Sequence, residues 1–420
     1  MASRATAAVL AAIAAAALLG ACEDEERAAP KRADRSPAGR PAAEPRPRSL
    51  LTRLIPPPEG VLPAARVPAR IGQLVSRMPL ERKVAQLLLV GFDGTDSSAP
   101  FFDKLRRLEL GGVVVRRFNY TGGDSLDGLT EAVANAAAGR TRLPPFVLAQ
   151  QEGGDFSAFP DLPPGLLPGE IETSGDAADL AGRTARALKR AGLNGMLGPV
   201  VDVSGGGGVL GDRAYSDEPA RVRADARGVV AAFRRQRMLS APSHFPGIGA
   251  AASNPDDGPA QVGLDLEQIE RRDLGPFRAG IRAGAPAIVV GHASYAPDSF
   301  VVPGSLSRAI ETNLLRGGVA FRGIAITDDL EAGAITASHR VPRAAVQAVQ
   351  AGADMVWISG PESEWEAAYQ ELLAAAKARR ITVARLNAAV TRIVTAKREL
   401  GLRNRTKPRP EEPVAPTGVP

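Results

Sequence analysis

Between residues 80 and 360, short apolar runs alternate with amphipathic segments, and this alternation constrains the fold more than any other feature. Eight runs have the length and composition of buried strands: 84–92, 111–117, 146–150, 193–203, 238–244, 287–292, 323–329 and 353–359. Segments with helical spacing follow them, for example 176–192 and 218–237. Strands that are apolar throughout are typical of parallel sheets covered by helices. The pattern predicts an α/β fold, a (β/α)8 TIM-type barrel in a single folded domain, with an open doubly wound sheet as the alternative.

Polar residues close several of these apolar runs. In a barrel of this type the active site lies at the carboxyl ends of the strands, so these residues are the first candidates for function. They are Gln150, Gln151, Glu152, Asp202, His244, His292, Asp328 and Asp329. Two of the three histidines of the chain therefore fall at strand ends.

The loop after the fifth run, SHFPGIGAAASNPDDGP at 243–259, has an unusual composition. Glycine permits close backbone approach and proline fixes φ, so the loop can hold its histidine and its adjacent Asp256 and Asp257 on a constrained frame. We interpret it as an active-site loop. The alternative is a surface connection with solvated aspartates.

The N-terminal residues 1–21 have a short basic start, an apolar Ala/Leu stretch and small residues before Cys22, which is the only cysteine. This pattern predicts a lipoprotein signal peptide, with Cys22 as the lipidation site, rather than a retained membrane span. An ordinary cleaved signal is the alternative. Residues 22–68 would then form a lipidated Pro/Arg/Ala-rich tether, 69–402 the barrel, and 403–420 a second disordered segment.

Charge and motif content exclude several function classes. The net charge of +6 leaves only +1 for residues 69–402, so we expect no nucleic-acid partner. The Gly-rich stretch 204–213 lacks the ending of a phosphate-binding loop, and no His-x-His or His-Glu-x-x-His spacing occurs. We therefore expect no cofactor and no catalytic metal.

The order of the motifs is similar to that of the N-terminal domain of glycoside hydrolase family 3, and most similar to its single-domain bacterial β-N-acetylhexosaminidases. The motifs, in chain order, are MPLERKVAQLLLVGFDG, QQEGG, LGPVVDV, Asp212-Arg213, SHFPGIG, PGSLSRAIETNLLRGGVAFRGIAITDDLEAGAI and AVQAGADMVWIS. The resemblance covers roughly residues 75–400 and implies a barrel fold and a glycosidase activity.

The resemblance implies roles for individual residues. Asp328 matches the family's nucleophile, a carboxylate that forms a glycosyl-enzyme. Arg213 and His244 match residues that contact the sugar, and Gln150, Ser243 and His292 are further candidates for substrate binding. Alternatively, Asp328 or Asp329 caps a helix that starts near Leu330, and Arg213 and His244 only make hydrogen bonds at the barrel end.

The chain also departs from the family pattern. Gln150 stands where the family has Asp, Ser243 where it has Lys, and Asn254-Pro255-Asp256 where it has the Asp-Ser-His of its acid/base dyad. A carboxyl group can do this work if its pKa is raised. We therefore predict that Asp256, or alternatively Asp257, is the general acid/base.

These observations predict a lipid-anchored, extracytoplasmic, monomeric glycosidase of the cell membrane. It would remove a terminal β-linked sugar, N-acetylglucosamine, from peptidoglycan fragments or related glycans by a retaining mechanism. The low aromatic content, 4%, favours a short carbohydrate substrate. The alternatives are an exo-β-glucosidase specificity and a sugar-binding lipoprotein that has lost turnover.

Overall fold

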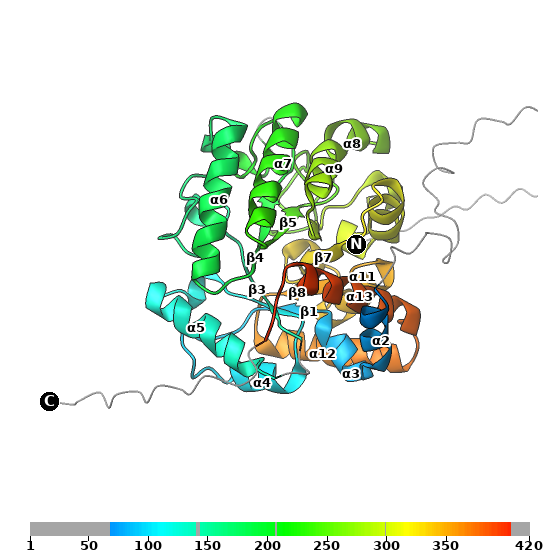
Figure 1. Ribbon diagram of the computed structural model, residues 1–420. Coiled ribbons are helices and arrows are strands. Elements are labelled where there is room, and N and C mark those ends of the chain that lie inside the picture. The colour runs from blue at the N-terminus through cyan, green and yellow to red at the C-terminus, as the bar shows by residue number, and fades with distance from the viewer. Residues whose placement is uncertain (1–67, 140–142, 206–207, 299, 405–420) are drawn as a thin grey trace, which may run out of the picture. The chain divides into compact units, whose positions relative to one another are not determined.

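Eight parallel strands form one sheet that curls into a nearly closed barrel (Figure 1). The computed structural model describes residues 68–139, 143–205, 208–298 and 300–404. The strands are β1 Leu88–Val90, β2 Gly112–Val114, β3 Phe146–Ala149, β4 Gly195–Val200, β5 Leu239–Ser243, β6 Ala287–Val290, β7 Ile324–Asp329 and β8 Met355–Ile358. Each lies inside one of the eight predicted apolar runs, and the (β/α)8 prediction is confirmed.

The two outer strands of the sheet, β5 and β6, meet through Phe245. The strand order is β5-β4-β3-β2-β1-β8-β7-β6. The N–H of Phe245 donates to the Val289 carbonyl at 2.8 Å, and the N–H of Gly291 donates to the Phe245 carbonyl at 2.9 Å. These bonds join the two ends of the sheet, so the open doubly wound alternative is wrong.

The strands explain why their sequences do not alternate. Every residue of β1 to β6 and β8 is buried, because side chains on one face fill the barrel and those on the other contact helices. In β7 only the last two residues, Asp328 and Asp329, are half-buried. The polar end of β7 is thus the part of that strand that reaches solvent.

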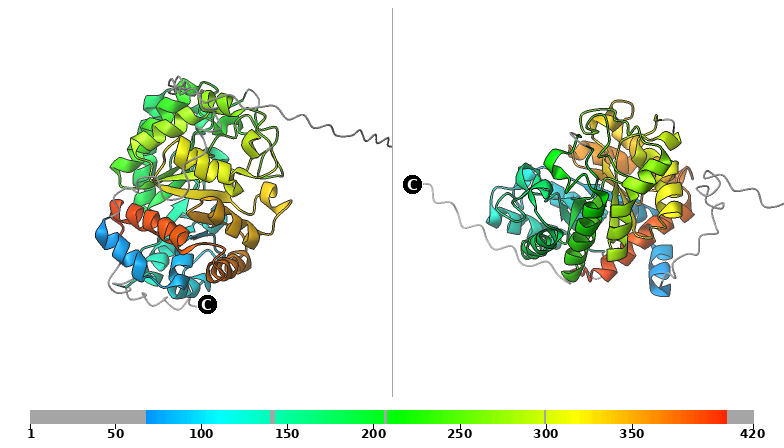
Figure 2. Two further views of the ribbon diagram at one scale, coloured as in Figure 1. Left: turned by 90° about the vertical axis from the view of Figure 1, so that its right-hand side faces the viewer. Right: turned by 90° about the horizontal axis from the view of Figure 1, so that it is seen from above.

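Helices surround the strands, and Figures 1 and 2 show α6 and α7 side by side along β4 and β5. The α-helices are α2 Ala69–Arg77, α3 Leu80–Gln86, α4 Phe101–Leu108, α5 Gly123–Ala136, α6 Ser174–Arg190, α7 Pro219–Arg235, α8 Leu266–Arg272, α9 Leu274–Ala283, α10 Gly333–Thr336, α11 Val341–Ala351, α12 Glu362–Lys377 and α13 Val383–Glu399. A π-helix, η7 (Ala309–Gly318), connects β6 to β7. The first and last of these helices, α2 and α13, lie against each other.

Helix α6 shows how local sequence sets these boundaries. The Thr173 hydroxyl accepts the N–H of Asp176 at 3.1 Å and caps the first turn, where the Asp176 charge is favourable. Lys189 lies in the last turn, and Gly192 follows with φ of 81°.

The segment 266–284 has helical spacing throughout in the sequence, but in the structure it is divided into α8 and α9 at Asp273.

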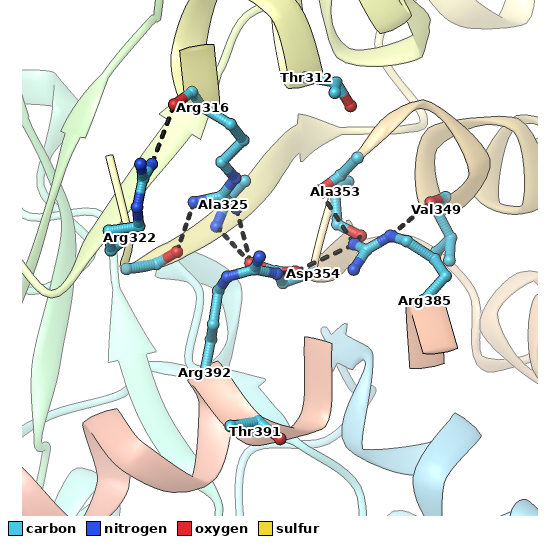
Figure 3. Close-up of polar contacts among 12 residues, drawn as sticks. Thr312, Arg316, Arg322, Ala325, Val349, Ala353, Asp354, Arg385, Thr391 and Arg392 are labelled. Carbon is cyan, nitrogen blue, oxygen red and sulfur yellow. Dashed lines mark hydrogen bonds and ion pairs between the residues drawn. The ribbon is translucent and has the colours of Figure 1, made fainter. Parts of the chain in front are cut away.

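Opposite the polar strand ends, the buried carboxylate of Asp354 gathers three arginines just before β8 (Figure 3). Arg316 donates at 2.7 Å, Arg392 at 2.8 Å and Arg385 at 3.0 Å. Burial alone would raise the pKa of Asp354, but the three guanidinium groups hold it below its ordinary value. This cluster ties α13 and η7 to the amino end of the barrel.

The predicted signal peptide, Cys22 and almost all of the 22–68 tether lie outside the described residues, as does most of 403–420. Within the described ranges, we find no helix whose length and apolar character would let it span a bilayer.

Candidate active site

The ends of β5 and β7 bring His244 and Asp328 together. His244 follows β5 directly, and its Nε2 lies 3.7 Å from Oδ2 of Asp328. The Asp328 side chain is only 13% exposed, and its Oδ1 accepts the N–H of Asp329 at 3.0 Å. An imidazole and a carboxylate predicted from separate motifs therefore share one side of the barrel mouth.

Asp202, at the end of β4, orients His244. Its Oδ2 lies 2.8 Å from the imidazole Nδ1 and also accepts the backbone N–H of His244 at 3.0 Å. Its Oδ1 accepts the N–H of Ile248 at 2.8 Å. Because a carboxylate only accepts, Nδ1 carries a proton and Nε2 is the atom that faces Asp328. One buried carboxylate thus fixes both the ring and the start of the loop after β5.

The two carboxylates set the charge of His244. Burial opposes the imidazolium, but Asp202 and Asp328 outweigh it and raise the pKa of His244 to about 9. At neutral pH the ring is therefore a cation, with a carboxylate on each side.

Arg213 is held by Glu152, the central residue of the QQEGG motif. Its Nε and NH2 donate to the two carboxylate oxygens of Glu152 at 2.8 and 3.0 Å, and its guanidinium lies over the Phe156 ring at 4.6 Å. Burial would lower the pKa of Arg213, but Glu152, with smaller contributions from Asp256 and Asp328, holds it above its ordinary value. This bidentate pair fixes the plane of the guanidinium.

The loop after β5 carries Asp256 into the same group of charges. Asp256 remains exposed. Partial burial and the Asp328 carboxylate nevertheless raise its pKa, against the opposing effect of His244, Arg213 and His292. The Asp328 charge therefore favours the protonated form of Asp256, the form that a general acid needs.

The other predicted residues differ in how close they come to this group. Asp257 is exposed beside Asp256. Gln150 lines the cavity described below. Ser243 is buried, with its hydroxyl 3.5 Å from the Pro199 carbonyl. His292 lies at the end of β6, where its Nε2 donates to the Asp329 carbonyl at 2.8 Å and its Nδ1 contacts the Ser305 hydroxyl at 2.7 Å.

The helix cap proposed for Asp328 or Asp329 is wrong. Helix α10 begins at Gly333 and its N-cap residue is Ala332. Asp329 instead accepts the N–H groups of Glu331 and Ser359 at 3.3 and 3.2 Å and bonds the Ser359 hydroxyl. Asp328 is therefore not used to cap the following helix.

A cavity of about 280 Å³ lies next to the polar group, above β2, β3 and β8. Its lining includes Arg116, Gln150, Glu152, Phe156, Asp329 and Trp357. Glu152 holds Arg213, and Asp329 neighbours Asp328, so the cavity opens beside the charged group. A compact cavity with a few polar groups is suited to a small ligand.

Sequence reasoning placed Glu152 and Asp202 at strand ends but gave them no role. Their partners, Arg213 and His244, are 61 and 42 residues away in the chain. Only the closed barrel brings them together. Within the described ranges, no group of three or more His, Cys, Asp or Glu side chains is arranged to hold a metal ion.

Comparison with known proteins identifies the family. The model of the glycosyl hydrolase family 3 N-terminal domain matches residues 79–396. This chain belongs to glycosyl hydrolase family 3. It is a glycosidase, and its substrate is a carbohydrate.

Two curated relatives support the assignment to family 3. A beta-hexosaminidase of Xanthomonas oryzae pv. oryzae is 32% identical over 310 residues, which are 71% of this chain and 90% of the relative. A beta-hexosaminidase of Stenotrophomonas maltophilia is 32% identical over 286 residues, covering 66% and 84% of the two chains.

Solved structures agree with the family 3 fold. LpqI of M tuberculosis superposes with a TM-score of 0.70 at 28% identity, over 78% of this chain and 96% of that protein. A family 3 beta-N-acetylglucosaminidase from Paenibacillus sp. str. FPU-7 superposes with a TM-score of 0.72 at 27% identity, over 77% of this chain. The family 3 chain described here spans 63% of that longer protein.

Proposed function

We propose that this family 3 glycosidase is lipid-anchored and extracytoplasmic, and that it removes terminal β-linked N-acetylglucosamine from peptidoglycan fragments or related glycans with net retention. The observation that carries the proposal is the group formed by Asp328, His244 and Asp256. One carboxylate lies 3.7 Å from a cationic imidazole, and a second carboxyl group nearby has a raised pKa.

In the first step Asp328 attacks the anomeric carbon, and the bond to the aglycone oxygen breaks. Asp256 gives its proton to that oxygen, so the aglycone leaves as an alcohol and a glycosyl ester remains on Asp328. Because part of the rise in the pKa of Asp256 comes from the Asp328 charge, ester formation lowers that pKa. Asp256 then accepts a proton from water, which opens the ester with a second inversion.

The cationic groups bind the sugar in this proposal. Arg213 and His244 donate to hydroxyl oxygens from fixed positions, because Glu152 and Asp202 hold them. Gln150 contributes a neutral amide to the cavity wall. His292 donates to the carbonyl of Asp329, next to the nucleophile, and Ser243 ends β5 directly before His244.

The relatives named beta-hexosaminidase and beta-N-acetylglucosaminidase support an N-acetylated sugar. The replacements at Gln150 and Ser243 fall among the proposed sugar contacts and favour a second candidate, an exo-β-glucosidase specificity. A panel of aryl β-glycosides decides between the two. N-acetylglucosaminide turnover at least about tenfold above glucoside turnover supports the first candidate.

The same panel tests the nucleophile. Asp328→Ala in the full chain is expected to lower kcat/KM at least about a thousandfold. Asp257→Ala tests the alternative acid/base: its kcat/KM is expected to stay within about threefold of wild type, and a loss as large as that of Asp256→Ala would assign the role to Asp257. NMR of the first product is expected to show the β-anomer. An α-anomer as first product contradicts retention.

The anchor rests on the N-terminal sequence. Cells producing the wild-type chain are expected to hold it in the membrane fraction, whereas Cys22→Ala releases it or leaves its signal uncleaved. An unchanged distribution and mass of the Cys22→Ala chain contradicts lipidation at this residue.

A further inference from the structure

The tip of the Asp256 loop is tied to the connection that follows the nucleophile strand. The N–H of Gly333, in the first turn of α10, donates to the Asp256 carbonyl at 2.8 Å. The N–H of Ala334 donates to the Pro255 carbonyl at 2.9 Å. Gly333 is five residues beyond Asp328, so the two proposed catalytic carboxylates are linked through a short, hydrogen-bonded path.

The loop tip is also ordered within itself. The side-chain oxygen Oδ1 of Asn254 accepts the N–H of Asp256 at 3.1 Å, and the backbone carbonyl of Asn254 accepts the N–H of Asp257 at 3.1 Å. This is an Asx-stabilised turn. Two further bonds fix the base of the loop. The N–H of Ile248 donates to the Asp202 carboxylate, and the N–H of Ala252 donates to the backbone carbonyl of Gln261 at 3.1 Å. The contact with Gly333 is a third point of attachment, and it fixes the turn against α10.

This contact depends on the absence of a side chain at Gly333. A Cβ at this position would lie 2.5 Å from the Asp257 carbonyl carbon and 2.6 Å from both the Asp257 oxygen and the Gly258 nitrogen. These are backbone atoms, so they cannot rotate away as a side chain does. Gly333 does not have a positive φ, so the constraint is space and not backbone conformation.

We propose that Gly333 is a positioning residue for the reaction: its missing side chain lets the loop turn dock on α10 and so places the Asp256 carboxyl beside Asp328. The inference rests on the proposed function, because it takes Asp256 as the acid/base. The docking itself rests on the hydrogen bonds and the close approach alone.

The test compares Gly333→Ala with Gly258→Ala in the full chain. Gly258 is the matched control, because a Cβ there meets nothing within 4 Å although it lies in the same loop. Gly333→Ala is expected to lower turnover of a glycoside with a poor leaving group about tenfold or more, because such a substrate needs the acid. The burst rate of dinitrophenol release from an activated glycoside is expected to stay within about threefold of the wild-type rate. This leaving group needs no proton, so the step does not depend on the acid.

Hydrogen exchange gives a readout that does not depend on activity. Amides 248–259 are expected to exchange faster in Gly333→Ala, and at the wild-type rate in Gly258→Ala. Unchanged exchange in Gly333→Ala, or equal losses on both classes of substrate, overturns the positioning role. If the wild type turns over no substrate, the proposed function fails, and the exchange result still tests the docking.

A second variant covers the case in which Gly333→Ala does not fold. Asn254→Ala removes the bond that orders the turn without adding any atom to the interface with α10. Like Gly333→Ala, it is expected to lower turnover of the glycoside with a poor leaving group and to speed hydrogen exchange in the loop. Both effects are expected to be smaller than in Gly333→Ala. Wild-type values for both measurements in Asn254→Ala overturn the proposal.

Discussion

His244 faces Asp328 with its Nε2 atom, 3.7 Å from the carboxylate, because Asp202 holds the other ring nitrogen at 2.8 Å. Asp202, His244 and Asp328 lie at the carboxyl ends of three different strands, β4, β5 and β7. The arrangement places a persistent positive charge beside the proposed nucleophile. A substitution at Asp202 is therefore expected to alter the reaction through His244, although Asp202 itself does not contact substrate in this proposal.

Asp202→Asn is expected to lower the pKa of His244 by at least about one unit. Burial lowers this pKa, and in the variant only the Asp328 carboxylate is left to raise it. In wild type the imidazolium persists up to about pH 9. The alkaline limb of kcat/KM against pH therefore moves to lower pH in the variant. The asparagine oxygen can still accept from Ile248, which limits the effect on the loop.

NMR titration of the ring protons checks this directly, because the chain has only three histidines. The signals of His292 and His339 serve as references. A wild-type His244 that titrates near 6.5 contradicts the electrostatic account of this site.

Arg213→Lys is expected to lower kcat/KM about 10- to 100-fold while leaving the fold intact. Lysine keeps the charge but loses the planar pair of bonds to Glu152 and the stacking on Phe156. Steady-state kinetics on the preferred aryl glycoside measure the effect. Arg107→Lys changes an exposed arginine of α4 that does not line the cavity and is the control. Equal activity of both variants would show that the two bonds between the Arg213 guanidinium and Glu152 have no part in catalysis.

Asp354→Ala is expected to destabilise the protein by about 3–5 kcal/mol, because it leaves the Arg316 guanidinium buried without its carboxylate. Urea unfolding at pH 7 measures this loss. Asp103→Ala breaks an exposed pair with Arg106 and is expected to cost less than about 1 kcal/mol.

The Asp354 contribution also has a defined pH dependence. Its folded pKa lies below the unfolded value, so its stabilisation is complete above about pH 4 and is lost as pH falls through the folded pKa. Asp354→Asn is therefore expected to unfold with a weaker pH dependence in acid than wild type. An identical acid transition in both proteins would contradict this assignment.

The sequence was sufficient to predict the barrel because buried parallel strands leave a strong signal. Each predicted apolar run contains a strand, and the polar residues that close the runs, such as His244 and Asp328, lie at the barrel mouth. The composition of the loop after β5 also had a physical cause. Gly247 has φ of 130°, and a Cβ on Gly249 would lie 1.8 Å from the Val203 carbonyl oxygen.

Partnerships could not be predicted from the sequence. Arg213 pairs with Glu152, and His244 with Asp202, only because the closed barrel brings the ends of different strands together. A local sequence pattern does not contain this information. The start of α10 was misplaced for a related reason. The Asp328-Asp329 pair has the form of a helix cap, but Asp329 bonds Ser359 of the neighbouring strand end, and the helix begins three residues later than expected.

The most direct test of the account is azide rescue of Asp256→Ala. With a dinitrophenyl β-glycoside of the preferred sugar, the first step needs no acid, and the glycosyl ester on Asp328 should accumulate because no base activates water. We expect slow turnover that azide accelerates about tenfold or more, with a β-glycosyl azide as product. Turnover of Asp256→Ala at the wild-type rate, or a slow variant that azide leaves unchanged, would contradict the assignment of Asp256 as acid/base.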